Sequence, residues 1–172
     1  MSDNLEKRLE RASNEQSGHN MVAIVKGGNN RRAYLIEYNI PEIIGFIASS
    51  VRQYEKICNV ELPFEEILNE VGKKLGITEN LSSYLSNKKS IEYIFEQLNQ
   101  PVKGNHKIGD IVDLYGYIVT QIVLVKNKNK CLEKSKEKDV IVETLLDYLK
   151  PEIGPQEDYN ENQFYKIRAY KL

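Results

Sequence analysis

Apolar residues recur at helical spacing over much of the middle of the chain. The clearest run places Ile43, Ile47, Val51 and Tyr54 three or four residues apart, shortly after Pro41. A first helical turn tolerates proline because its backbone N–H would have no partner there. This pattern predicts a core helix that begins at Pro41.

Similar patterns predict five further helices. Their expected bounds are Pro63 to Gly76, a start at Thr78 and Glu79, Ser90 to Pro101, a start at Asp110, and residues 139–149. Residues 111–125 carry so many β-branched side chains that a strand is an alternative there. We interpret that segment as a helix because its apolar residues form one broad face.

Three other segments, near the ends of the chain, have the character of strands. Residues 21–26 and 32–38 are β-rich, and the glycines and asparagines at 27–30 supply the positive-φ residues of a hairpin loop. Residues 164–172 alternate between polar and apolar side chains. A lone terminal strand is unstable, so we expect this segment to pair with the hairpin as a third strand.

The elements together predict an α+β fold, a mainly helical bundle with a small antiparallel sheet made of an N-terminal hairpin and a C-terminal strand. We expect a polar N-terminal arm over residues 1–20 and a single α+β domain over residues 21–172.

The charge balance argues against a whole-molecule field that attracts nucleic acid. Lys and Arg number 24 against 25 Asp and Glu, which gives a net charge of −1, so nucleic-acid binding would need a local patch. The first twenty residues are too polar for a secretory signal, and the apolar stretch 111–125 is too short to span a bilayer. We therefore expect a cytoplasmic protein with no membrane partner.

Few residues offer catalytic or metal chemistry. Cys58 and Cys131 lie far apart without a zinc or disulfide spacing, so Cys58 is expected to pack as a small apolar residue. Asp110 and Asp113 suit either a cation or, as we favour, the capping of a helix N-terminus. His106 lies in a polar loop segment without a metal-binding neighbour. We expect no catalytic residue, no cofactor and no metal, and so no enzyme.

One segment resembles a helix-turn-helix of the phage-repressor type. It runs from Val71 through Gly72, Gly76 and Ile77 to Leu85, and it has a small residue where two helices approach and a glycine at the turn. The resemblance implies that a recognition helix begins near Thr78. It also implies a DNA contact through the following residues: Thr78, Asn80, Ser83, Lys88 and Lys89.

A second candidate surface combines basic and aromatic residues on the expected sheet. Cationic side chains between tyrosines can hold a phosphate backbone while the rings stack on bases. The residues are Arg31, Arg32, Tyr34, Lys166, Arg168 and Tyr170. The alternative is that the lysines and arginines solvate the outer face and protect a sheet edge.

Two functions fit these observations. The first is a non-catalytic nucleic-acid-binding accessory or regulatory protein, with DNA or RNA as partner. The second is a small structural or adaptor subunit of a larger prokaryotic complex that acts through protein contacts. In size and layout the chain is similar to small subunits of prokaryotic CRISPR surveillance complexes. The sequence leaves the oligomeric state open.

Overall fold

The chain divides into two compact units. The computed structural model describes residues 20–27, 32–77, 79–102, 104–149 and 168–171, with side chains only within residues 39–149. One unit comprises Met1–Ile40 with Pro151–Leu172, and the other comprises Pro41–Lys150. The single domain expected over residues 21–172 stays a prediction. Residues 1–19, most of the expected N-terminal arm, lie outside the described residues.

The first unit contains three paired strands: β1 (Asn20–Gly27), β2 (Arg32–Asn39) and β3 (Arg168–Lys171). They pair antiparallel in the order β1-β2-β3. Between β1 and β2 the register runs from Asn20 opposite Asn39 to Gly27 opposite Arg32.

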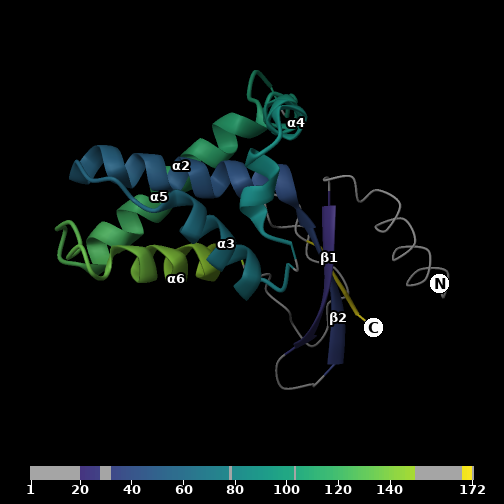
Figure 1. Cartoon of the computed structure of the whole chain (residues 1–172), viewed down its shortest axis with the longest axis horizontal. Helices are drawn as coiled ribbons and strands as arrows, with labels where there is room; N and C mark the ends of the chain where they lie inside the picture. The colour runs from purple at the N-terminus through teal and green to yellow at the C-terminus, as the bar shows by residue number, and fades with distance from the viewer. Residues whose placement is uncertain (1–19, 28–31, 78, 103, 150–167, 172) are drawn as a thin grey trace. The chain divides into compact units, whose positions relative to one another are not determined.

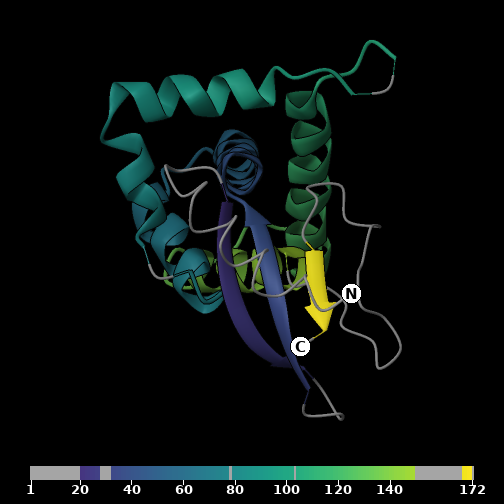
Figure 2. The same cartoon turned by 90° about the vertical axis from the view of Figure 1, so that its right-hand side faces the viewer.

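The second unit is built from helices (Figure 1). They are α2 (Ile40–Cys58), α3 (Phe64–Lys74), the 3-10 helix η1 (Leu81–Leu85), α4 (Lys88–Leu98), α5 (Ile108–Lys126) and α6 (Glu137–Leu149). In Figure 2, α2 is viewed nearly along its axis, and the other helices surround it. The central position of α2 agrees with the strength of its apolar pattern, since Val51 and Tyr54 are almost fully buried.

The predicted α+β class, a mainly helical bundle with a small antiparallel sheet made of an N-terminal hairpin and a C-terminal strand, is wrong, because the helices form a compact unit of their own whose described residues contain no strand. Among residues 41–149 the elements are all helical, and no strand lies in that part of the chain. The helices bury their apolar faces on each other, as Leu68 of α3, Val119 of α5 and Leu145 of α6 show with exposed fractions of at most 1%. A helical layer that closes its own core does not need a sheet to cover it.

The predicted helix after Asp110 is confirmed as α5. Its buried residues are Val112, Gly116, Val119, Thr120 and Val123, a spacing that only a helix places on one face. Their helical period outweighs the strand preference of the β-branched residues, because burial on a helical face decides the conformation here.

Three local predictions at helix starts are wrong. The expected helix from Thr78 and Glu79 is instead the five-residue helix η1. Helix α4 is capped by Asn87, whose Oδ1 accepts a hydrogen bond from the Lys89 N–H at 2.8 Å, and not by Ser90. Asp110 lies in the first turn of α5, where its Oδ2 accepts from the N–H of the N-cap residue Lys107 at 2.9 Å.

Helix α5 is long and apolar enough to cross a membrane, the one such helix among the residues searched. Its mean hydropathy reaches 1.5 over an 18-residue window, of which 28% is buried. The core helix of a soluble protein can have the same length and composition. The expected absence of a membrane partner therefore stays a prediction.

Candidate functional site

A groove of about 630 Å³ lies between α2, α4 and α5 in the helical unit. Volumes of roughly 300–1,000 Å³ with mainly apolar walls are typical of binding sites. The walls are apolar side chains from four helices and the start of α3: Ile44, Ala48, Val51, Phe64, Leu85, Ile91, Ile94, Phe95, Leu98 and Val112.

Leu98, at the end of α4, is where the three helices of the groove come together. A Cβ on Gly45 of α2 would lie 2.9 Å from Leu98 Cδ2, and one on Gly109 of α5 would lie 3.2 Å from the Leu98 carbonyl oxygen. Because neither glycine has a side chain, α4 approaches both helices closely. Residues far apart in the sequence thus form one apolar wall.

Phe95 is the most exposed aromatic side chain of this wall, with 61% of its surface accessible. Its neighbour Ile94, at the base of the same wall, is buried, with 6% of its surface exposed. The sequence pattern had placed both residues on one apolar helix face. Only the packing shows that Phe95 projects at the groove instead of filling the core.

Charged residues of both signs line the same groove. They are Arg52 and Glu55 from α2, Lys107 before α5, and Asp110 and Asp113 from its first turns. Gln53 donates from Nε2 to the backbone carbonyl of Asp113 at 2.9 Å, which ties α2 to the start of α5. An apolar floor with charged edges suits a partner that is itself amphipathic.

The connection between α4 and α5 fixes the end of the groove that carries these carboxylates. Pro101 and Lys107 form an antiparallel bridge, and the Val102 N–H donates to the His106 carbonyl oxygen at 2.8 Å. Gly104 takes the tight turn with a φ of +72°, which glycine adopts without steric cost.

The residues expected at the turn of the helix-turn-helix segment pack as that resemblance implies. A Cβ on Gly72 would lie 2.9 Å from Leu81 Cγ, so α3 and η1 approach closely there. Gly76 has a φ of +88°, and Ile77 is buried. The helix after the turn is only the 3-10 helix η1, which leaves the resemblance itself a prediction.

Four of the five nucleic-acid candidates in this segment are described, and all four are exposed: Asn80, Ser83, Lys88 and Lys89. Thr78 lies outside the described residues. Tyr84, which follows Ser83 in η1, is buried, with 8% of its surface exposed, and its hydroxyl donates to Glu79 Oε2 at 3.4 Å. Burial, with the neighbouring Glu79 carboxylate, raises the pKa of Tyr84 to about 12.

The candidates on the sheet occupy two different sets of positions. Arg32 and Tyr34 lie on β2, where Tyr34 pairs with Lys171 of β3. Tyr170 pairs with Leu35 and Arg168 with Glu37. Directly paired positions share a face and neighbouring positions alternate. The positions of Arg32 and Tyr34 therefore fall on one face of the sheet, and those of Arg168 and Tyr170 on the other. Arg31 and Lys166 lie outside the described residues.

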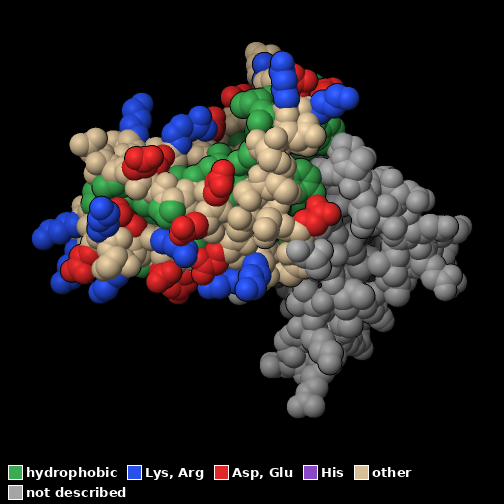
Figure 3. Space-filling view, in the orientation of Figure 1, with side chains coloured by type: hydrophobic (Ala, Val, Ile, Leu, Met, Phe, Trp, Pro, Cys, Tyr) green, Lys and Arg blue, Asp and Glu red, His purple; other side chains and the backbone are tan. Residues whose placement is uncertain are grey.

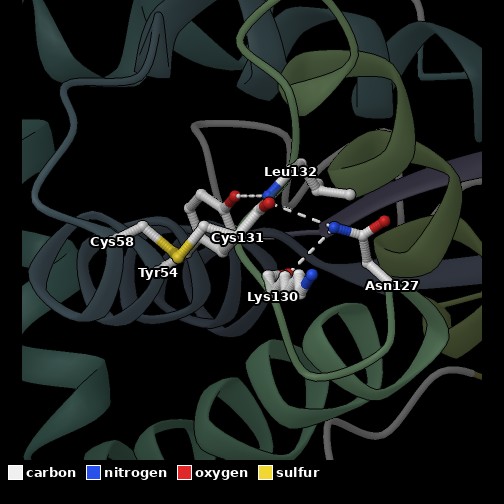
Figure 4. The surroundings of a disulfide bond; sticks show 6 residues. All are labelled: Tyr54, Cys58, Asn127, Lys130, Cys131 and Leu132. Carbon is white, nitrogen blue, oxygen red and sulfur yellow. Dashed lines mark hydrogen bonds between the residues drawn. A yellow bond between two sulfur atoms is a disulfide. The ribbon is translucent and has the colours of Figure 1, made fainter.

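The prediction for the cysteines is wrong, because Cys58 and Cys131 form a disulfide with a Cα–Cα distance of 5.8 Å (Figure 4). It joins the end of α2 to the turn before α6. The Leu132 N–H donates to the Tyr54 hydroxyl oxygen at 2.8 Å and holds the same turn. A separation of 73 residues carries no local spacing signal, so the sequence did not indicate the pairing.

Asn127 holds the other side of this turn. Its side-chain Nδ2 donates to the carbonyl oxygens of Lys130 and Cys131, both at 3.0 Å. Lys128 and Asn129 have positive φ values of 58° and 62°. The turn therefore has a defined conformation that carries the exposed residues Lys128 and Lys130.

Within the searched part of the chain, no group of three or more His, Cys, Asp or Glu side chains is placed to hold a metal ion. Asp110 has the capping role favoured over a cation site, but it acts from the third position of α5 and not as the N-cap residue itself. The expectation that the protein needs no metal or cofactor stays a prediction.

Comparison with known proteins adds no relative. The chain matches no protein-family model, no curated protein and no solved structure.

Proposed function

We propose that the protein is a non-catalytic adaptor that binds an amphipathic helix of a partner protein in the groove between α2, α4 and α5. The observation that carries this proposal is the apolar groove of about 630 Å³ with the exposed ring of Phe95 at its wall. An exposed apolar side chain that adjoins an apolar groove extends it into a contiguous apolar patch, and such patches commonly mark binding surfaces.

The shape and charges of the groove favour a helix as the bound segment. Helix-in-groove recognition uses apolar anchors at i, i+3 or i+4, and i+7 on one face of the bound helix. Side chains of that spacing would meet the apolar wall, while Arg52 and Glu55 lie on α2 and Asp113 on α5 beside it. A partner helix with mixed charges flanking its apolar face would complement these positions.

Selection from a displayed library of helical peptides tests this proposal. We expect enriched peptides to share the apolar spacing and to lose at least about tenfold in affinity against Phe95→Glu, because a central aromatic anchor typically contributes more than 1 kcal/mol. Tyr117→Glu is the matched control, since Tyr117 is 51% exposed on α5 and does not line the groove. Equal binding to Phe95→Glu and wild type, or no enrichment, would refute the proposal.

A second function, nucleic-acid binding, is supported by a different observation. Asn80, Ser83, Lys88 and Lys89 are exposed along the continuous segment from η1 to the first turn of α4. The overall charge does not favour nucleic-acid binding, since acidic and basic side chains are interspersed on the face of the helical unit in Figure 3. Contacts would depend on this local segment.

Fluorescence anisotropy with labelled single-stranded and duplex DNA and RNA tests the second function. We expect affinity that falls as salt rises and that drops for the double variant Lys88→Ala/Lys89→Ala, because each lysine lost removes a phosphate contact. Lys56→Ala, an exposed position on α2, should bind as wild type does. Binding that neither salt nor the double variant weakens would contradict this function.

A further inference from the structure

Helix α5 presents an apolar stripe on the side that faces away from its own core. Leu114, Tyr117 and Val125 are exposed at 57%, 51% and 63%, and they are three of the six large apolar side chains that are exposed among the described residues. At about 100° per residue they fall on one face, opposite Val119 and Val123, and the half-buried Gln121 lies between Tyr117 and Val125 on that face. The core of the helical unit therefore leaves this face of α5 uncovered.

The two ends of this stripe carry opposite charges. Asp110 and Asp113 are exposed in the first turns of α5. Lys126, Lys128 and Lys130 are exposed at its C-terminal end and in the turn that follows. Hydrogen bonds hold that turn, with Lys128 N–H donating to the Val125 carbonyl oxygen at 3.2 Å.

We propose that the stripe is a dimer interface, in which α5 packs antiparallel on α5 of a second copy of this chain. A two-fold axis midway along the helix, between Val119 and Thr120, brings Leu114 of one copy opposite Val125 of the other. The same axis brings Asp113 of each copy to the basic turn of the other.

The charge pattern selects both the partner and the direction. In a two-fold interface the same surface must complement itself, and a helix that is acidic at one end and basic at the other does so only when antiparallel. In a parallel pair, Asp113 of one copy would lie beside Asp113 of the other, and Lys128 beside Lys128. These like charges would repel each other. The arrangement has a mainly apolar centre, with Gln121 as its polar member, and charged ends, as protein interfaces do.

The size of the stripe sets the expected strength. Helix α5 has 19 residues and is about 28 Å long at 1.5 Å per residue. One pair of helices of this length lies at the low end of stable interfaces, which bury roughly 1,200–2,000 Å². We therefore expect a reversible dimer with a dissociation constant in the micromolar range.

Sedimentation equilibrium of the full oxidised chain over a concentration series tests the dimer. We expect Leu114→Glu and Tyr117→Glu each to raise the dissociation constant at least about tenfold, since a charge enters the apolar centre. Phe95→Glu is the matched control: Phe95 is 61% exposed but lies on α4, so the dimer should persist while peptide binding in the groove is lost. Circular dichroism confirms that each variant is folded.

Charge reversal tests the antiparallel direction. Asp113→Lys alone and Lys128→Asp alone should each weaken the homodimer by about threefold to tenfold, because exposed ion pairs contribute up to about 1 kcal/mol. An equal mixture of the two variants should form a heterodimer with near wild-type affinity, since both contacts between the copies then join opposite charges.

Three results would overturn the proposal. One is a wild-type chain that stays at the monomer mass over the whole concentration series. Another is a dimer that persists in Tyr117→Glu. The third is a monomer that sediments with phosphatidylcholine–phosphatidylglycerol vesicles and loses that binding in Tyr117→Glu, which would show that lipid covers the stripe.

Discussion

Gly116 lies where α5 crosses α2, and a side chain there has no space. A Cβ on Gly116 would lie 2.6 Å from Ser49 Oγ and 3.0 Å from the backbone nitrogen of Ser50. Thr120 Oγ1 donates to the Gly116 carbonyl oxygen at 2.9 Å and approaches the Ser50 carbonyl oxygen at 3.3 Å. Small residues thus set the approach of the two helices.

At this position we expect Gly116→Ala to lower the free energy of unfolding by about 2 kcal/mol, because overpacking a core costs typically 1–3 kcal/mol. Alanine stabilises a helix by about 1 kcal/mol relative to glycine. The gain in helix propensity therefore opposes the packing cost at this position. Urea unfolding followed by circular dichroism measures the change. Gly45→Ala is the comparison, since its Cβ would meet only the end of the Leu98 side chain, and its loss should be smaller. A Gly116→Ala variant as stable as wild type would show that α2 and α5 can separate.

At the scale of elements, an ion-pair network joins α3 to α6. Lys138 Nζ lies 3.3 Å from Glu70 Oε2 and 3.7 Å from Glu66 Oε2, and Lys74 Nζ lies 3.5 Å from Glu70 Oε1. Burial raises the pKa of the Glu70 carboxyl, but the hydrogen bond and charge of Lys138, together with Lys74, outweigh it and lower the pKa overall. The Lys138 pKa is raised by the same Glu70 contact.

The direction of this shift gives a pH dependence. A carboxyl whose folded-state pKa is lowered stabilises the fold above its ordinary pKa of 4.5, and this contribution is lost as pH falls through the lowered pKa. We expect Glu70→Gln to lower the free energy of unfolding at neutral pH by about 0.5 kcal/mol, as partly exposed ion pairs do. The difference from wild type should disappear at acid pH in urea titrations.

Glu65→Gln is the control for this prediction. Glu65 is exposed on the same helix and takes part in none of the three contacts, so its replacement should change stability little at any pH. A Glu70→Gln effect that is equally large at acid and neutral pH would contradict the ion-pair explanation.

At the scale of the whole molecule, the Cys58–Cys131 disulfide closes the longest covalent loop in the described part of the chain. It spans 73 residues and encloses α3, η1, α4 and α5. Closing a loop of this length removes conformational entropy from the unfolded chain, worth about 4 kcal/mol in the loop-entropy treatment. The disulfide thus stabilises the helical unit as a whole.

We therefore expect the double variant Cys58→Ala/Cys131→Ala to unfold at a lower urea concentration, with a loss of up to about 4 kcal/mol. Wild type with its disulfide reduced should show a similar loss, which separates the effect of the bond from that of the alanines. Unchanged unfolding midpoints in both samples would show that the bond does not constrain the unfolded chain.

The same disulfide bears on the expected cytoplasmic location, which stays a prediction. Cytosolic thiols are normally kept reduced, whereas disulfides persist in oxidising compartments. Alkylation of the protein in intact cells, before lysis, separates the two cases. Two free thiols would support the cytoplasmic location, and protected cysteines would contradict it.

The sequence by itself determined most helix bounds in the described region, because those depend on local patterns. Helix α3 begins after Pro63 and ends before Gly76, whose φ of +88° only glycine adopts readily. Pro101 follows α4, and the apolar period of residues 111–125 predicted α5. Each of these features acts within a few residues of chain, so it can be read without the fold.

Tertiary structure alone decided the features that depend on distant segments. The pairing of Cys58 with Cys131, the wall of the groove at Leu98 and the exposure of Phe95 each follow from how helices pack, not from spacing along the chain. The five-residue η1 in place of a longer helix also reflects packing, since Leu81 and Tyr84 are buried and Asn69 Oδ1 accepts from the Ser82 N–H at 2.9 Å. Side chains brought together from far apart outweigh local preference, and a single sequence does not show which of them meet.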